Sequence, residues 1–453
     1  MKLLTRDRLY YRMAARLIFP IAFQNALFLV VNMLDTIMLG KLGSESEAAI
    51  SAAGLASQPF FVLSLFIFGT VSGSSVLVAQ YWGRNDTDSI NSIAGITVSF
   101  ALIVGTVSSI LIALFPTWVL RIFSSDEAVI APGTEYLKII VFSYIPTALS
   151  GVLSGIMRSV ERVKCALYSS MIGLFVNLIL NYCLIFGKLG FPRMEIRGAA
   201  IATVIARVFE LMYVIWYVFI HDKTINIRLA RMFKISRMLV CDFVKVSMPV
   251  VINETTWSLG VAMYSVIIGN LGTQAYAAYS VAGIIERIAL VFSIGFANAG
   301  AVIIGKTIGA GEPDKAYEYA KTTLFLSALS SVLLGLIIFA IRYPVIGYFD
   351  ITDEAKGYAA AIITVMSILI VTKGYNFASI VGVLRGGGDT KYVLALDVIP
   401  LWTVALPLGY LFAYVFRFPV YIVYSAFFSD EIVKMIIGFF RFRSKKWIKN
   451  VTR

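Results

Sequence analysis

Long apolar stretches separated by short polar segments run through the whole chain. A helix needs about 20 apolar residues to cross the hydrocarbon core of a bilayer, and twelve stretches come close to or exceed this length. The predicted spans are residues 17–34, 48–83, 89–120, 139–157, 165–187, 198–220, 246–269, 271–305, 322–341, 357–384, 392–416 and 418–440. This pattern predicts an all-α integral membrane protein with twelve transmembrane helices.

The two halves of the sequence match one another. An offset of 229 residues superposes the prolines and glycines around the first and seventh spans, and a three-residue contraction keeps later glycines in register. The matched pairs are Pro20 with Pro249, Gly40 with Gly269, Gly43 with Gly272, Gly54 with Gly283, Gly69 with Gly295 and Gly83 with Gly309. Six spans per half give both copies the same polarity, so we predict two six-helix lobes related by a pseudo-twofold axis along the membrane normal.

The predicted lobes are residues 1–220 and 246–453, the second with a basic C-terminal tail, joined by a cytoplasmic linker over 221–245. Lys and Arg concentrate in the cytoplasmic loops of membrane proteins. With both termini inside, the cytoplasmic segments hold 26 of the 39 Lys and Arg residues. We therefore expect a multi-pass protein of the cell membrane whose two termini lie in the cytoplasm.

The composition agrees with lipid as the main solvent. The chain is 59% hydrophobic and 14% charged, whereas soluble domains have about 25% charged residues. The net charge of +13 is then expected to reflect topology, and no nucleic-acid partner is predicted. Three scattered cysteines and a single histidine, His221, supply neither a metal cluster nor a catalytic triad. The sequence therefore predicts no enzyme activity and no cofactor.

Charged residues inside the spans need a reason, because ionised side chains are costly at bilayer depth. Arg207 and Glu210 are three residues apart, and Asp430 and Lys434 are four apart, so each couple is expected to pair on its own helix. Asp397 is left open: it either pairs with Lys373 or with another group. The sequence alone assigns no partner and no role to Glu286 and Arg287, which are adjacent.

Asp35 and Glu254 differ from these couples, because neither has a basic residue within one helical turn. Asn177 and Asn181 are one turn apart on the fifth predicted span, so their amides point the same way. A carboxylate with amide oxygens suits Na⁺, or a carboxyl group that exchanges a proton. The alternative for these polar groups is an interhelical hydrogen-bond cluster without a transport role.

Several segments carry a family resemblance. They are FPIAFQ and NMLDTIMLGKLG near the start, VNLILNYCLIFGKLG and IRGAAIATVIAR at spans five and six, and VLRGGGDTK after span ten. Over essentially its full length, the chain resembles the multidrug and toxic compound extrusion (MATE) transporters, which are drug/Na⁺ or drug/H⁺ antiporters. The resemblance implies ion or proton coupling at Asp35, Asn177, Asn181 and Thr203, with Na⁺ as a possible ion at Asp35, Asn177 and Asn181.

The chain also departs from the family pattern. Asn181 stands where some members have aspartate, which leaves Asp35 as the only carboxylate of the first set. In the second half, the resemblance implies substrate or cation binding at Glu254, Lys373 and Asn376. The span-ten aspartate of the NorM-like branch is missing there.

The function implied by the resemblance is secondary active antiport. A monomer would export organic compounds, above all amphipathic cations, in exchange for Na⁺ or H⁺ by alternating access. The expected partners are small-molecule substrates and the lipid bilayer. The alternative is a flippase for a lipid-linked or other amphipathic precursor, for which Lys373 and Arg207 are the basic residues in the spans that hint at an anionic substrate.

Overall fold

The computed structural model describes residues 4–42, 46–122, 126–349 and 351–452, and these segments form helices and loops without any β-strand. The prediction of an all-α protein is confirmed. Within the described part, ten helical segments have the length and apolar character to cross a membrane. They are Arg8–Leu39, Ala49–Gly83, Thr87–Leu114, Val129–Ser159, Val163–Phe186, Glu195–His221, Thr273–Gly309, Pro313–Gly347, Asp353–Arg385 and Thr390–Val415.

Two further helical segments occupy the places of predicted spans seven and twelve. They are α11 (Arg237–Gly269), and α17 (Val420–Ala426) followed directly by α18 (Ser429–Arg443). The other helices are α1 (Arg8–Leu39), α2 (Ser46–Ala56), α3 (Gln58–Gly83), α4 (Thr87–Leu114), α5 (Pro116–Arg121), α6 (Glu127–Ile140), α7 (Tyr144–Ser159), α8 (Val163–Phe186), α9 (Glu195–Trp216), α10 (Leu229–Met232), α12 (Thr273–Gly309), α13 (Pro313–Gly347), α14 (Asp353–Phe377), α15 (Thr390–Pro400) and α16 (Leu406–Tyr410).

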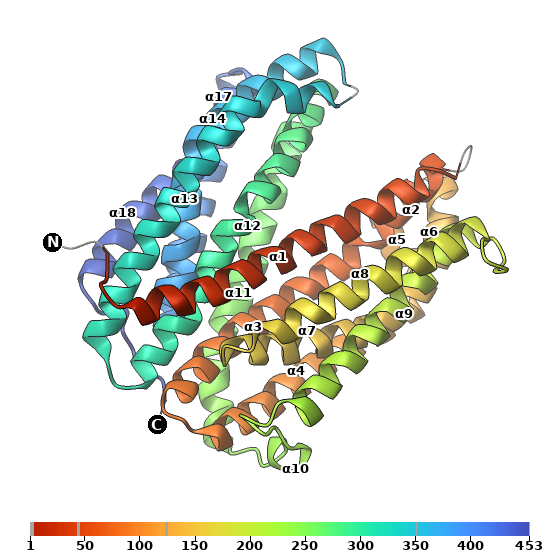
Figure 1. Ribbon diagram of the computed structural model, residues 1–453. Helices are drawn as coiled ribbons and strands as arrows, with labels where there is room; N and C mark the ends of the chain where they lie inside the picture. Colours follow the sequence, from red (N-terminus) through yellow and green to blue (C-terminus); the bar gives the residue numbers. More distant parts are fainter. Residues whose placement is uncertain (1–3, 43–45, 123–125, 350, 453) are drawn as a thin grey trace. The chain divides into compact units, whose positions relative to one another are not determined.

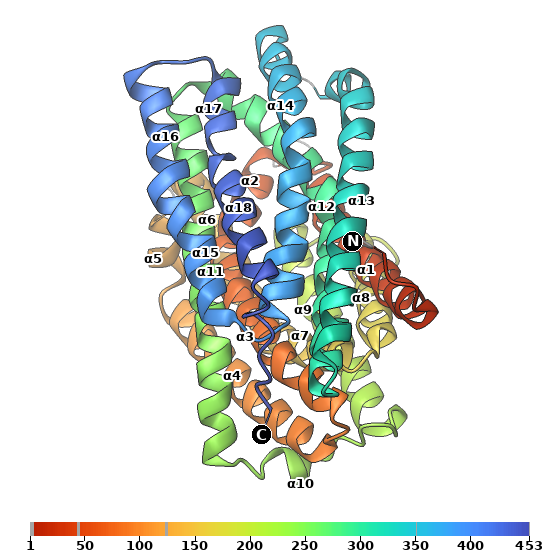
Figure 2. The same cartoon turned by 90° about the vertical axis from the view of Figure 1, so that its left-hand side faces the viewer.

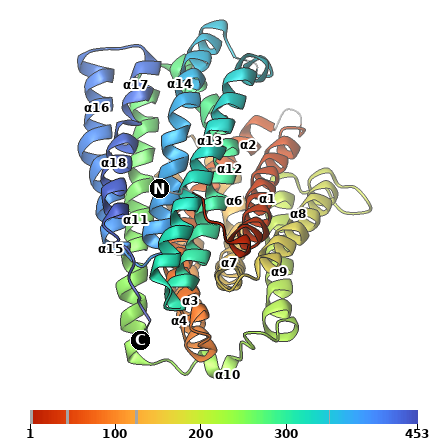
Figure 3. The same ribbon diagram turned by 60° about the vertical axis from the view of Figure 1, so that its left-hand side comes forward.

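The chain folds into two compact units. The N-terminal unit contains Phe23–Val78 and Asp86–Val251, and the C-terminal unit contains the chain up to Ala22, Ala79–Asn85 and the chain from Ile252 onward. In the N-terminal unit, α8 packs along α9, and α4 packs along α7 (Figures 1 and 3). In the C-terminal unit, α12 packs against α13 and α14 (Figure 2).

The internal repeat reappears in the borders of these units. α1 passes from one unit to the other between Ala22 and Phe23, and α11 does so between Val251 and Ile252. These two borders are separated by the same offset that pairs Pro20 with Pro249, so the beginnings of the two helices are exchanged in the same way. The lobe limits at residues 220 and 246 stay predictions.

A second symmetric feature lies in the C-terminal unit, where the end of α3 meets the end of α12. A Cβ atom on Gly83 would lie 2.0 Å from the carbonyl oxygen of Lys306, and one on Gly309 would lie 1.9 Å from that of Gln80. The repeat register that pairs Gly83 with Gly309 also pairs Gln80 with Lys306. Each glycine therefore faces the backbone of the other copy, and only a hydrogen atom fits at either position.

Gly83→Ala and Gly309→Ala are each expected to destabilise the protein, because the added methyl group must push two helix backbones apart. Overpacking of this kind costs about 1–3 kcal/mol or more. Gly54→Ala and Gly283→Ala are the matched controls, since this repeat pair has no atom within 4 Å of an added Cβ. The thermal unfolding midpoints of the four purified variants in detergent test the idea. Equal midpoints for Gly309→Ala and Gly283→Ala would contradict it.

Candidate functional site

The N-terminal unit joins the four residues predicted for ion coupling in one hydrogen-bonded chain. Asn181 Nδ2 donates to Asp35 Oδ1 over 2.5 Å and to Asn177 Oδ1 over 3.1 Å. Asn177 Nδ2 donates in turn to Thr203 Oγ1 over 3.3 Å, and the Thr203 hydroxyl donates to the Ala199 carbonyl over 3.0 Å. Asp35 comes from α1, the two asparagines from α8 and Thr203 from α9, so three helices build the set.

The sequence spacing explains how this chain forms. Asn177 and Asn181 are one helical turn apart on α8, and α9 packs directly along that helix. Asn181 is fully buried, and its Oδ1 atom has no hydrogen-bond partner among the described residues. In the arrangement present here, an amide N–H group faces the carboxylate. Rotation of the Asn181 amide would turn its free oxygen toward Asp35, where a proton or a cation could bridge the two oxygens.

Asp35, Asn177 and Thr203 line a pocket inside the N-terminal unit. The pocket encloses about 650 Å³ of empty space, part of which is open to the surroundings. Its apolar wall includes Val31, Phe60 and Ile140. A carboxylate, an amide and a hydroxyl beside an apolar wall can bind and orient an amphipathic organic molecule.

An ion pair lines the same pocket. Arg207 Nη1 lies 2.9 Å from both carboxylate oxygens of Glu210, which confirms the pairing predicted from their spacing on α9. Glu210 rests against the backbone of Gly173 on α8, where a Cβ atom would lie 1.8 Å from Glu210 Oε1. The glycine therefore leaves the room that this carboxylate occupies.

The three site residues predicted in the second half each have a partner from another helix. The pairs are Glu254 with Arg385 (2.7 Å), Lys373 with Glu286, and Asn376 with Glu431 (2.7 Å). Among the described residues, no hydrogen bond or ion pair joins Glu254 to Lys373 or to Asn376. The structure thus joins the first predicted set in one chain of hydrogen bonds. The residues of the second set belong to three separate contacts, each with a different partner.

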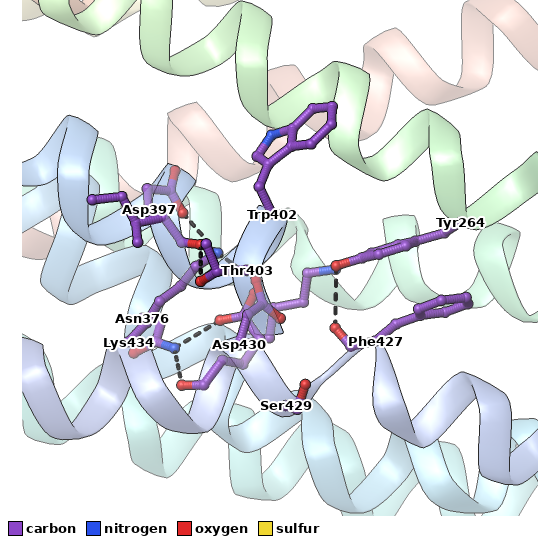
Figure 4. A network of polar contacts seen from close by, with 12 residues as sticks. Tyr264, Asn376, Asp397, Trp402, Thr403, Phe427, Ser429, Asp430 and Lys434 are labelled. Carbon is purple, nitrogen blue, oxygen red and sulfur yellow. Dashed lines mark hydrogen bonds and ion pairs between the residues drawn. The ribbon is translucent and has the colours of Figure 1, made fainter. Parts of the chain in front are cut away.

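Lys434 on α18 connects two further carboxylates in the C-terminal unit, as Figure 4 shows. Its Nζ atom lies 2.8 Å from Asp397 Oδ1 and 2.7 Å from Asp430 Oδ2. Asn253 Nδ2 donates to the other Asp397 oxygen over 3.0 Å. The predicted pairing of Asp430 with Lys434 is confirmed, and Asp397 takes Lys434 as its partner while Lys373 takes Glu286.

The sequence reasoning missed the partner of Glu254. Arg385 is 1% exposed and lies far from Glu254 in the sequence, so no spacing rule could join them. The repeat contained a signal, because the segment ending at Arg158 parallels the one around Arg385 and places a basic residue at the end of both apolar spans. Within the described residues, no group of three or more His, Cys, Asp or Glu side chains is arranged to hold a metal ion.

A protein-family model described as MatE matches the chain twice, over residues 20–183 and 249–411. The two matches begin at Pro20 and Pro249, the pair that opens the internal repeat. Together they cover more than half of the chain, and each covers one of its halves. The repeat is therefore a property shared with the family.

Curated relatives match along nearly the whole chain. A Thermotoga maritima protein named "Probable multidrug resistance protein NorM" is 26% identical over 452 residues, which cover 96% of this chain and 92% of that protein. A protein of the same name from Agrobacterium fabrum is 28% identical over 397 residues, which cover 85% and 83%. A "Crystal structure of MATE in the bent conformation" has a TM-score of 0.87 at 19% identity, covers 96% of this chain and 95% of its own, and shows the same fold.

Proposed function

The chain belongs to the MatE family of multidrug and toxic compound extrusion transporters, and from this membership we propose that it exports several organic compounds in exchange for H⁺ or Na⁺. The observation that supports this proposal most is the pocket of the N-terminal unit, in which Asp35 is joined to Asn181 and Asn177. The transporting unit is proposed to be the monomer, because one chain builds this whole pocket.

Asp35 is the proposed exchange point. An ionised Asp35 attracts either a cation or a proton, and both compete for the same carboxylate. Export follows if the ion and the substrate bind the inward- and outward-facing states with different affinities, so that each shifts the populations of the two states. Binding of the ion from the outside would then release the substrate to the outside, and no covalent chemistry is needed.

The flippase alternative finds less support in this pocket. A lipid-linked phosphate or pyrophosphate calls for several basic groups, whereas Arg207 is the one basic residue among the described residues that line the pocket. That guanidinium is already bound to Glu210. Lys373, the other basic residue considered for such a role, belongs to the C-terminal unit, where it is bound to Glu286.

Inside-out vesicles test the proposal with ethidium as the transported cation. An imposed Na⁺ or pH gradient of the correct direction is expected to drive ethidium into vesicles that contain the protein, and monensin or a protonophore should abolish the matching signal. Vesicles without the protein are the control. If neither gradient moves ethidium beyond that control, the antiport proposal is wrong.

We propose in addition that both termini and the 221–245 segment lie in the cytoplasm, as the distribution of Lys and Arg indicates. Cys241 is exposed, so it is first replaced by serine. Ser236→Cys should then react with a membrane-impermeant maleimide in inside-out vesicles and stay unlabelled in intact cells. Asp353→Cys, on an exposed residue of a predicted external loop, should behave in the opposite way. Labelling of Ser236→Cys in intact cells would contradict the proposed topology.

A further inference from the structure

Each unit has a segment that follows its last predicted span and binds back to that unit. In the N-terminal unit this segment is the linker strap, residues 222–234, and in the C-terminal unit it is the tail strap, residues 444–452. We propose that the two straps are a repeat-related pair, that each ties the helices of its own unit together, and that the charges at their anchors direct each strap to its own unit. This inference goes beyond the proposed function, since it concerns neither the substrate nor the coupling ion.

The same turn follows the fourth and the tenth predicted spans. In the first half the turn is closed by a hydrogen bond from Arg162 N to the Met157 carbonyl over 2.8 Å. In the second half, at an offset of 227 residues, it is closed by a bond from Asp389 N to the Leu384 carbonyl over 3.1 Å. The residue before each donor has a positive φ, 66° in the first turn and 93° in the second. Arg162 and Asp389 therefore occupy equivalent positions of the repeat.

These two equivalent residues each hold a strap, but with opposite charges. Arg162 Nε lies 3.3 Å from Oδ1 of Asp222 in the linker strap, and Lys449 Nζ in the tail strap lies 2.6 Å from Asp389 Oδ1. In both halves the partner lies 60 residues beyond the turn residue. The buried carboxylate belongs to the strap in the N-terminal unit and to the turn in the C-terminal unit. Either strap would meet a charge of its own sign at the other turn, which disfavours the wrong pairing.

A second pair of anchors lies at the first turns of α4 and α13. Arg231 Nη1 of the linker strap lies 2.9 Å from Asp88 Oδ1, and Lys445 Nζ of the tail strap lies 3.0 Å from Asp314 Oδ1. The register that pairs the close-contact glycines of α3 and α12 also pairs these two aspartates. Both ion pairs are exposed, so each contributes little to stability. Their polarity is the same in the two units, so the choice of unit depends on the turn anchors.

The tail strap is also bound through its backbone. The fully buried side chain of Gln80 donates to the Lys449 carbonyl over 3.0 Å and accepts from Val451 N over 2.8 Å. Lys449 N donates to the Gly387 carbonyl over 2.8 Å. Trp447 is buried, and a Cβ atom on Gly387 would lie 2.3 Å from its ring. Gln80 belongs to the part of α3 that lies in the C-terminal unit, so the tail strap holds that end of α3 there.

The linker strap is bound in a comparable way to α4. Its short helix α10 packs against α4 (Figure 1). Arg228 N donates to Asn91 Oδ1 over 3.0 Å, and a Cβ atom on Gly95 would lie 1.9 Å from the Met232 carbonyl oxygen. Each strap therefore joins the start of α4 or α13 to the turn after the fourth or tenth span. Helices tied in this way at one end are expected to move as one body.

The polarity of the tail anchor is tested in the full-length protein with Val451→Cys as a probe and Cys241→Ser as background. Asp389→Arg places a third cation beside Arg441 and Lys449, which both bind Asp389 in the wild type. The tail strap should be released, and Val451→Cys should react with a maleimide in detergent about tenfold faster or more. Adding Lys449→Asp again places one carboxylate with two cations and copies the polarity of the N-terminal unit. This double reversal should recover most of the protection.

Hydrogen exchange over residues 79–85 measures the effect on α3. Asp389→Arg should speed this exchange, and the double reversal should slow it again, because the tail strap holds that end of α3. Asp314→Asn is the matched control, since it removes only the exposed ion pair of the same strap. Its labelling rate should change by less than about twofold.

Two results would overturn the inference: an Asp389→Arg variant that is labelled as slowly as the wild type, or a double reversal that is labelled as fast as Asp389→Arg. Unchanged hydrogen exchange over residues 79–85 in a variant with a released tail would show that the strap does not hold α3. If Asp389→Arg does not fold, Lys449→Ala replaces it and should raise the labelling rate several-fold, and an unchanged rate there would also overturn the inference. None of these measurements depends on transport, so they stand apart from the antiport proposal.

Discussion

Asp35→Asn protein is expected to insert into the membrane and fold like the wild type, yet to lose gradient-driven export almost completely. Asparagine has nearly the same shape as aspartate and keeps an oxygen that can accept the bond from Asn181 Nδ2. Packing should therefore survive. What disappears is the ability of this side chain to change its charge or ion occupancy, and an exchange cycle stops when its exchange point cannot do so.

Two neighbours serve as graded controls for this experiment. Asn177→Ala removes two links of the chain that leads to Asp35, and Thr203→Ala removes the link between Thr203 and Asn177. A hydrogen bond of this kind is worth about 1 kcal/mol, so we expect each variant to lose about two- to tenfold in export rate. Elution as a single symmetric peak in size-exclusion chromatography confirms folding of all variants. Near wild-type pumping by well-folded Asp35→Asn would show that coupling does not pass through this residue.

The positions of the helices could be predicted from the sequence because a bilayer sets the length of an apolar run. The repeat could be predicted because its prolines and glycines keep a common register in both halves, and some of these glycines meet a local steric need. Gly83 and Gly309, for instance, face one another's helix backbones across the contact of α3 with α12. The Asp35 set could also be predicted, since an isolated carboxylate and two amides one turn apart can be recognised in the sequence alone.

The ionic partners of the charged residues in the second half could not all be predicted from the sequence. Spacing rules apply within one helix, and they found Asp430 with Lys434 and Arg207 with Glu210 correctly. Glu254 pairs with Arg385 from another part of the chain. Such a contact depends on how helices are rotated and packed, which periodicity alone does not determine. The exchange of the beginnings of α1 and α11 between the two compact units escaped prediction for the same reason.

Lys434 is the residue whose loss should harm folding most. The C-terminal unit holds five buried or half-buried carboxyl groups in ionic or hydrogen-bonded contacts with three basic groups and an amide. The carboxyl groups are those of Glu254, Glu286, Asp397, Asp430 and Glu431, and their partners are Arg385, Lys373, Lys434 and Asn376. Lys434 is 1% exposed and holds two of these carboxylates at once. Removing one partner of a buried ion pair costs about 3–5 kcal/mol, because the remaining charge is stranded.

Lys434→Met is therefore expected to yield little folded protein, with a large drop in the unfolding midpoint of whatever can be purified. The triple variant Lys434→Met, Asp397→Asn and Asp430→Asn should recover most of that loss, because it removes the stranded charges together with their counter-ion. Lys434→Arg keeps a charge at this position and is expected to fall between the two. If Lys434→Met unfolds at the wild-type temperature, the bridge between Asp397 and Asp430 contributes nothing to stability. If the triple variant is no better than Lys434→Met, the damage does not come from stranded charge.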